Sequence, residues 1–270
     1  MTSIDGFSRQ KIPQGELWLA EGFEPAAIEL GLDHRSGWER HIAAGVHAGR
    51  GKVAFVETDA GSVMLKQLRR GGVAGPIWRE RFPSRRRLMA NLTLPALARE
   101  RGIATPPAVA LLLIASGPSL WRGWLAVRTV PGAVDFIDRV RERPPTHDEW
   151  AEALGAVRRL HDAGFGHPDL NLGNLMVDAA GDIWVIDLDR CRVRAGGLEP
   201  DARITAIRRI ERSYHKTCLL NGLDPDSRID WLELYSGGDR SLDLRWEERR
   251  DLDCARLERH RRGWRRQPRL

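Results

Sequence analysis

The sequence predicts an α+β fold with two lobes, an antiparallel β-sheet followed by a mainly helical part. Short apolar segments at residues 52–57, 62–68, 108–114 and 124–129 are typical of strands, and Pro131 and Gly132 follow the last of them. A further strand is expected to begin at His41, before a glycine-rich turn. Apolar residues then recur at helical spacing, at Trp150, Leu154, Val157 and Leu160. We therefore expect an N-terminal extension at 1–40, a lobe with a five-stranded sheet at 41–130, and a helical lobe at 131–270 that ends in an arginine-rich helix.

Composition limits the class of protein. The 270 residues carry a formal net charge of +6, and only four of the 43 basic residues are lysines. A basic surface predicts an anionic partner, such as nucleic acid, acidic lipid headgroups or a phosphorylated substrate, although a genome rich in G and C also favours arginine. The three cysteines are widely spaced, no apolar run is long enough to span a membrane, and the first residues lack a signal peptide pattern. These features favour a cytoplasmic protein with reduced thiols.

The most informative segment runs from His167 to Asp187. Asp169 is followed by Asn174 after five residues and by Asp187 after eighteen, which is the spacing of a kinase catalytic loop and its metal-binding carboxylate. In that pattern the first Asp accepts the proton of the acceptor hydroxyl, and the Asn and the second Asp hold Mg²⁺ against ATP. We therefore assign catalysis to Asp169 and metal binding to Asn174 and Asp187.

The residues between Asn174 and Asp187 have the composition of a β-hairpin. Residues 174–178 and 183–186 are apolar strand segments, and Ala179-Ala180-Gly181-Asp182 forms a tight turn between them. This hairpin brings Asn174 beside Asp187, and two oxygen ligands on adjacent strand ends suit Mg²⁺.

Phosphate-binding residues are expected in the N-terminal lobe. Gly49 and Gly51 lie in a glycine-rich turn whose backbone N–H groups can approach phosphates, and Lys66 lies on the following strand, where a kinase contacts the α- and β-phosphates. The helix at 85–101 has Asn91 where a glutamate partner for Lys66 is expected, and Glu80 and Glu100 are the nearby alternatives. Residues 127–132 occupy the position of an interlobe hinge and adenine pocket.

Two departures from the protein-kinase pattern indicate another acceptor. Pro168 replaces the arginine that reads a phosphorylated activation loop, and Leu188-Asp189 replaces Phe-Gly, with no Ala-Pro-Glu segment after it. Both favour a small-molecule or glycan acceptor over a protein.

These motifs resemble those of the 3-deoxy-D-manno-octulosonic acid (Kdo) kinases of the bacterial lipopolysaccharide kinase group, which have a protein-kinase-like fold. The similarity covers about residues 45–218, with Gly173 where His is common in that group. The resembling segments are Gly49-Arg50-Gly51, Leu65-Lys66-Gln67-Leu68-Arg69-Arg70-Gly71-Gly72, residues 102–107, Leu160-His161-Asp162, residues 167–174 and Ile186-Asp187-Leu188-Asp189-Arg190.

The resemblance implies ATP- and Mg²⁺-dependent phosphorylation of the 4-hydroxyl of Kdo on a Kdo-lipid A precursor. It also implies a peripheral position at the cytoplasmic face of the inner membrane, with no nucleic acid as partner. Arg69, Arg70 and the arginines at 249–266 are then expected to contact anionic groups of the acceptor or of the membrane.

Three alternative functions remain open. A heptose kinase or another small-molecule phosphotransferase shares the core and differs in its acceptor. A pseudokinase acting as a nucleotide-binding module is disfavoured by the presence of Lys66, Asp169, Asn174 and Asp187 together. A nucleic-acid-binding protein is suggested by arginine content alone.

Overall fold

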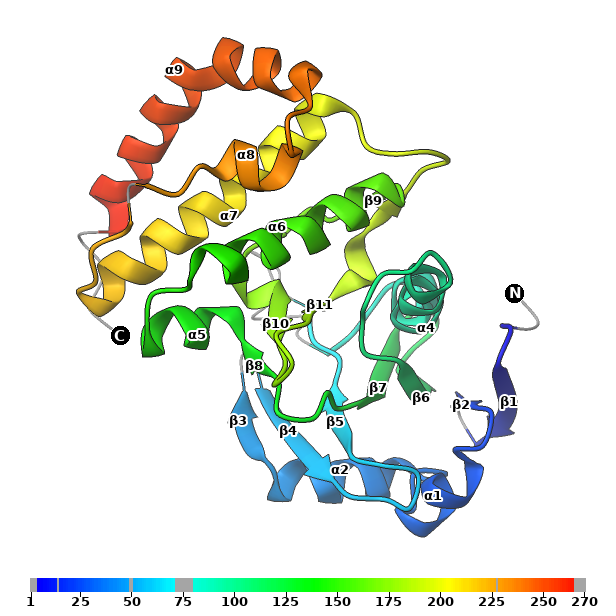
Figure 1. Cartoon of the computed structure of the whole chain (residues 1–270). Coiled ribbons are helices and arrows are strands. Elements are labelled where there is room, and N and C mark those ends of the chain that lie inside the picture. The colour runs from blue at the N-terminus through cyan, green and yellow to red at the C-terminus, as the bar shows by residue number, and fades with distance from the viewer. Residues whose placement is uncertain (1–3, 14, 49–50, 71–79, 227, 265–270) are drawn as a thin grey trace. The chain divides into compact units, whose positions relative to one another are not determined.

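A computed structural model describes residues 4–13, 15–48, 51–70, 80–226 and 228–264 of the chain (Figure 1). The chain divides into two compact units. The first consists of Met1–Leu97 and Pro106–Val130, and the second of Ala98–Thr105 and Pro131–Leu270.

The first unit is built on an antiparallel sheet of seven strands in its described residues, in the order β1-β2-β6-β7-β5-β4-β3. All neighbouring strands are antiparallel, and consecutive strands β3, β4 and β5 pair directly. The strands are β1 (Phe7–Ile12), β2 (Gly15–Ala20), β3 (Val46–Ala48), β4 (Gly51–Val56), β5 (Val63–Gln67), β6 (Ala108–Ala115) and β7 (Trp121–Arg128).

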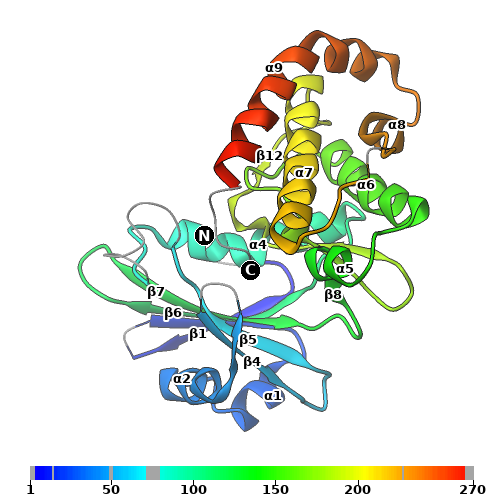
Figure 2. The same ribbon diagram turned by 90° about the vertical axis from the view of Figure 1, so that its left-hand side faces the viewer.

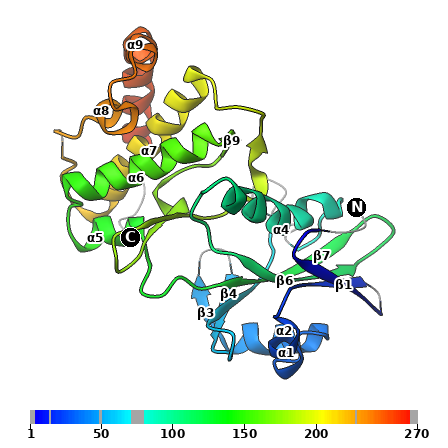
Figure 3. The same ribbon diagram turned by 45° about the vertical axis from the view of Figure 1, so that its right-hand side comes forward.

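Both faces of this sheet are covered. Helices α1 (Glu24–Glu29) and α2 (Arg35–Ala44) lie on one face, and α4 (Arg85–Glu100) packs on the other (Figures 2 and 3). Side chains alternate between the faces along each strand: Leu17 and Leu19 join the cluster of α1 and α2, whereas Trp18 between them joins the cluster of α4.

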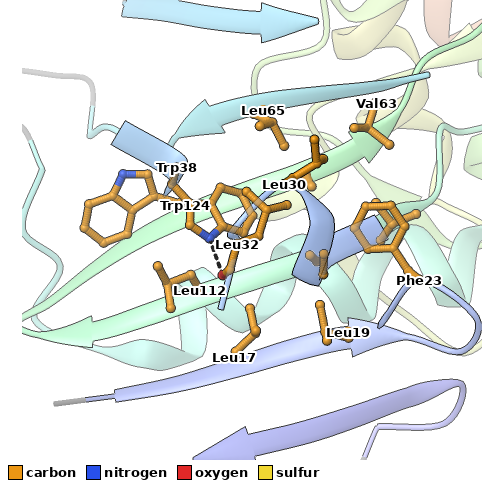
Figure 4. Packing of buried hydrophobic residues seen from close by; sticks show 14 of the residues in the cluster. Leu17, Leu19, Phe23, Leu30, Leu32, Trp38, Val63, Leu65, Leu112 and Trp124 are labelled. Atoms are coloured by element: carbon orange, nitrogen blue, oxygen red, sulfur yellow. Dashed lines mark hydrogen bonds between the residues drawn. The ribbon is translucent and has the colours of Figure 1, made fainter. Parts of the chain in front are cut away.

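The apolar cluster between the sheet and helices α1 and α2 contains two tryptophans (Figure 4). Trp38 and Trp124 are fully buried among leucines, and the Trp38 indole donates a hydrogen bond of 2.8 Å to the carbonyl of Leu32. This bond satisfies the one polar group of a large buried side chain and fixes the loop between α1 and α2 against the sheet.

Residues 1–40, which the sequence pattern sets apart as an extension, belong to the first unit. β2 pairs with the central strand β6, and Leu17, Trp18 and Leu19 are buried. Because both faces of this strand are covered, its apolar residues form a continuous run rather than an alternating pattern, and the sequence gives no strand signal. The segment from His41 to Ala44, expected to begin a strand, instead ends α2.

The second unit is mainly helical, and its short strands lie around the catalytic segment. Its helices are α5 (Phe136–Glu142), α6 (His147–Asp162), α7 (Pro200–Asn221), α8 (Trp231–Ser236) and α9 (Arg240–Trp264). Strands β11 (Ile183–Val185), β10 (Leu175–Val177) and β8 (Val134–Asp135) form one small sheet, and β12 (Arg192–Val193) pairs with β9 (Phe165–Gly166).

Helix α6 is central to this unit. Thr146 and Glu149 form a reciprocal capping box at its N-terminus, and the predicted face of Trp150, Leu154, Val157 and Leu160 is buried, which confirms the helix and its orientation. Trp150 makes ring contacts with aromatic side chains of α5, α7 and α8, namely Phe136, Tyr214 and Trp231.

The arginine-rich C-terminal helix α9 lies along α7 (Figures 1 and 2). The guanidinium of Arg208 on α7 stacks on Trp246 of α9 at 3.4 Å from the ring centroid, and Arg249 donates to the Thr205 hydroxyl at 3.2 Å. Part of the arginine content therefore fixes helices to one another. No helix among the described residues is long and apolar enough to cross a membrane.

A buried ion cluster gives a test of how β1 and β2 are held. The Glu16 carboxylate on β2 is 3% exposed and lies 2.6 Å from Arg9 on β1 and 3.0 Å from Arg85 on α4. Glu16→Gln leaves two arginines without their countercharge, so we expect a loss of about 3 kcal/mol in the free energy of unfolding, measured by denaturant titration. Glu39→Gln, which breaks the half-exposed pair with Arg35, is the control and should cost about 0.5 kcal/mol or less. Equal losses for the two variants would contradict this role of Glu16.

Candidate active site

The segment that carries Asp169 is positioned by a sharp turn after α6. Gly164 has φ of +82°, and a Cβ on it would lie 2.4 Å from the carbonyl oxygen of Arg194. The chain then enters β9, which pairs with β12. The residues just before the catalytic loop are thus joined to those just after Asp187.

His167 connects the loop to the strand that ends at Asp187. Its Nδ1 accepts the backbone N–H of Asp169 at 3.3 Å, so its Nε2 carries the proton and donates to the Ile186 carbonyl at 3.4 Å. Burial lowers the pKa of His167. The hydrogen bond to the Ile186 carbonyl and the carboxylates of Asp187, Asp169 and Asp189 act in the opposite direction and raise this pKa. A neutral imidazole suits this pair of bonds, which hold the loop to Ile186, the residue after β11.

Asn171 links Asp169 to Asn174. Its side-chain amide donates to the backbone carbonyl of Asp169 at 2.7 Å and to the Oδ1 of Asn174 at 2.6 Å, and its own Oδ1 accepts the N–H of Gly173 at 2.9 Å. One side chain therefore caps the short 3-10 helix at Leu172–Asn174 and orients the Asn174 amide. The sequence motif contained Asn171, but its spacing alone gave no indication of this function.

The expected hairpin is present. Strands β10 and β11 pair from Leu175↔Val185 to Val177↔Ile183, and the N–H of Ile186 donates to the carbonyl of Asn174 at 2.9 Å. Asp178 stabilises the turn: its carboxylate accepts the N–H groups of Ala180 and Asp182 and the Trp184 indole, with the Trp184 bond as the largest factor that lowers the Asp178 pKa. Asn174 and Asp187 are consequently adjacent at the open end of the hairpin.

Asp187 has a backbone conformation that is rare for a residue with a side chain. Its φ and ψ are 64° and 43°, and it is the sole non-glycine residue with positive φ in the described part of the chain. Such strain concentrates at functional sites, and Asp and Asn tolerate this region best. The carboxylate is exposed and has no hydrogen bond or ion pair within the described residues.

The oxygen donors at the end of the hairpin fit Mg²⁺. The Asp187 carboxylate is uncommitted, and the Asn174 Oδ1, which accepts one bond from Asn171, retains a lone pair. Mg²⁺ bound with nucleotide needs few protein ligands. The described residues contain no group of three or more His, Cys, Asp or Glu side chains able to hold a metal by themselves.

Asp169 forms an ion pair that the sequence pattern does not predict. Its Oδ2 forms an ion pair with Nη1 of Arg190, and the two side chains are 55% and 50% exposed. Arg190 lies in the 3-10 helix Leu188–Arg190 directly after Asp187. Its position in the Asp187-Leu188-Asp189-Arg190 motif was the available signal, but the pairing depends on the fold that joins β9 to β12.

The predicted phosphate-binding residues belong to the first unit. Lys66 lies near the C-terminal end of β5, opposite Val53 of β4 and Leu125 of β7, and its ammonium has no hydrogen bond or ion pair in the described residues. Gly51, expected in a glycine-rich turn, begins β4, and Gly49 lies outside the described residues. A Cβ on Gly51 would lie 2.7 Å from the Arg69 guanidinium, the end of a flexible side chain that would have to shift.

The helix partner expected for Lys66 is absent from the described residues. The Asn91 amide donates to carbonyls of its own helix, Arg87 and Leu88. Glu80 binds Arg122 and lies 3.5 Å from Arg69. Of the two arginines expected to contact anions, Arg69 is thus already part of an ion cluster, whereas Arg70 is half-buried with no partner in the described part of the chain.

Comparison with known proteins identifies the family. Residues 38–237 match the sequence profile of the Lipopolysaccharide kinase (Kdo/WaaP) family. The chain belongs to this family. It is therefore an ATP-using phosphotransferase, and the matched region contains both the strand with Lys66 and the segment with Asp169, Asn174 and Asp187.

Several curated members of the family are similar over most of their length, and each is named 3-deoxy-D-manno-octulosonic acid kinase. The Vibrio parahaemolyticus protein is 27% identical over 65% of this chain and 74% of its own. The Xylella fastidiosa protein is 30% identical over 62% and 68%, and a Vibrio vulnificus protein is 26% identical over 78% and 87%.

A solved structure of a family member supports the fold. The structure titled "WaaP in complex with acyl carrier protein" has a TM-score of 0.56 at 21% identity and covers 92% of this chain and 98% of that chain. The predicted kinase-like α+β fold, an antiparallel N-terminal sheet followed by a helical part, is confirmed.

A buried histidine beside the catalytic segment gives a pH-dependent prediction. His161 is fully buried, its Nδ1 lies 2.8 Å from the Tyr235 hydroxyl, and burial lowers its pKa to about 3, with smaller contributions from the charges of Arg203 and His167. The unfolded chain binds a proton near pH 6.5, so the neutral folded form loses stability as pH falls below that value.

We expect this histidine to contribute about 1.4 kcal/mol per pH unit to the loss of unfolding free energy between pH 6 and 5. Denaturant titrations of the wild type and of His161→Gln at these pH values measure the difference, because contributions from all other groups cancel between the two proteins. Parallel pH profiles would show that His161 is not held neutral.

Proposed function

We propose that this protein transfers the γ-phosphoryl group of ATP to the 4-hydroxyl of Kdo on a Kdo-lipid A precursor. The observation that carries the proposal is that hydrogen bonds made by Asn171 and Ile186 join the segments of Asp169, Asn174 and Asp187 in a chain of the Kdo/WaaP family. The curated relatives, named as Kdo kinases, support Kdo as the acceptor.

Each side chain has a distinct part in the reaction. Asp169 accepts the proton of the sugar hydroxyl as its oxygen bonds to the γ-phosphorus and the bond to the β-phosphate oxygen breaks, releasing ADP. Asn174 and Asp187 hold Mg²⁺, which when bound neutralises phosphate charge. Lys66 binds the α- and β-phosphates, and Gly49 and Gly51 approach them through the backbone. Positioning and charge neutralisation supply most of the acceleration.

The surroundings of the Lys66 ammonium support its assignment to phosphate binding. A cation paired with a carboxylate must give up that partner to bind phosphate, whereas the Lys66 ammonium has no such partner among the described residues. An anionic ligand therefore meets a cation that is already oriented by a strand in the middle of the sheet.

The acceptor also suggests where the protein acts. A lipid-linked sugar places the reaction at a membrane surface, so we propose a peripheral position at the cytoplasmic face of the inner membrane. Arg70 and, after rearrangement of its ion cluster, Arg69 are available to acidic groups of the acceptor or of the surrounding lipid.

Removal of the Asp169 carboxylate tests the proposal. We expect Asp169→Asn to lower kcat by about 10²- to 10⁴-fold with little change in ATP affinity, because the amide keeps the shape of the side chain but cannot accept a proton. Asp182→Asn, at an exposed position in the turn of the same hairpin, is the matched control and should keep wild-type kcat.

The assay is ATP-dependent phosphorylation of Kdo-lipid A precursor, with the phosphate located by mass spectrometry. Phosphate on a heptose-containing acceptor but not on Kdo would reject the acceptor and retain the kinase. Near-normal kcat for Asp169→Asn would reject the catalytic assignment.

A further inference from the structure

The ion pair between Asp169 and Arg190 leaves most of the guanidinium unused. Only Nη1 of Arg190 contacts the Asp169 carboxylate, and the remaining N–H groups have no hydrogen-bond partner in the described part of the chain. A guanidinium can donate from two parallel N–H groups to one carboxylate, and the strongest carboxylate recognition uses that geometry. Arg190, half exposed, can therefore bind a second carboxylate without being withdrawn from the site.

An acceptor that carries a carboxylate is repelled by the aspartates around Asp169 unless a cation such as Arg190 offsets their charge. The carboxylates of Asp169, Asp187 and Asp189 all act on His167, which places three negative charges around one imidazole. An acceptor with its own carboxylate approaches these charges and the phosphates of ATP. The cation in direct contact with Asp169 in the described structure is Arg190, so it is placed to offset this repulsion.

We propose that Arg190 determines acceptor specificity by binding the carboxylate of the sugar acid while Asp169 holds the hydroxyl that is phosphorylated. The inference rests on the proposed function and deepens it. In Kdo the carbon that bears the carboxylate and the carbon that bears the 4-hydroxyl are separated by a single ring carbon, so both groups can lie on one side of the molecule. Asp169 and Arg190, in direct contact, present the complementary acceptor and donors side by side.

The position of Arg190 in the chain strengthens the inference. Arg190 follows Asp187 by three residues, and β12 begins two residues later and pairs with β9 just before the loop of Asp169. The guanidinium is thus attached to the same framework as the predicted metal ligand and the predicted base. A residue in this position can bind the acceptor without movement of a larger segment.

The test compares an acidic and a neutral acceptor. Kdo-lipid A precursor and the same precursor with the Kdo carboxylate converted to its methyl ester are dispersed in one detergent, and kcat/KM is measured for each. We expect the wild type to prefer the acid by about 10- to 100-fold, the range of one charge-assisted hydrogen-bonded pair. Arg190→Gln should reduce this ratio to near one, and Arg190→Lys should retain part of it.

Arg192→Gln is the matched control. Arg192 lies two residues further on and is exposed, and its side chain has no hydrogen bond or ion pair in the described residues. Its substitution therefore removes the same charge and should keep the wild-type ratio. Because Arg190→Gln also removes the partner of Asp169 and can lower both rates, the affinities of the two acceptors are measured in parallel by calorimetry without ATP.

The outcomes separate the inference from the function it rests on. A preference for the acid that disappears in Arg190→Gln, in rates or in affinities, supports the proposal. An unchanged preference in Arg190→Gln overturns it while leaving the kinase function in place. A wild-type enzyme that phosphorylates neither acceptor contradicts the proposed function itself, and with it the role of Arg190.

Discussion

The candidate active site depends on the hydrogen bonds by which the catalytic loop is attached to the β10–β11 hairpin. The Ile186 N–H to the Asn174 carbonyl closes the hairpin, and Asn171 connects the Asn174 side chain to the backbone of Asp169. His167 adds a bond from the other side, to the Ile186 carbonyl. Residues separated by 18 positions are thereby held as one rigid group, and such preorganisation is what phosphoryl transfer requires.

Burial and exposure are divided between the neutral and the charged groups of this region. His161 and His167 are buried, and burial lowers the pKa of both. His161 pairs with the Tyr235 hydroxyl of α8, and His167 supports the loop through its two hydrogen bonds to the backbone. Asp169 and Asp187 are exposed, so their carboxylates remain hydrated. The backbone of Asp187 has a left-handed conformation, and such strain concentrates at functional sites.

The parts of the site that sequence could predict are those fixed by local spacing. The hairpin, helix α6 and the adjacency of Asn174 and Asp187 follow from turn residues and periodicity within about twenty residues. The ion pair of Arg190 with Asp169 and the burial of Glu16 between Arg9 and Arg85 depend on contacts between distant elements. Strand β2 is hard to predict for a different reason: both of its faces are covered, so its sequence has no alternation of apolar and polar residues.

The claim that the hairpin end holds a metal–nucleotide complex is tested most directly with Mn²⁺ in place of Mg²⁺. Electron paramagnetic resonance titrations with a non-hydrolysable ATP analogue compare the wild type with Asp187→Asn, which tolerates the same backbone conformation, and with Asp182→Asn in the hairpin turn. The account predicts binding at least about tenfold weaker for Asp187→Asn and unchanged for Asp182→Asn. Wild-type affinity in Asp187→Asn would contradict it.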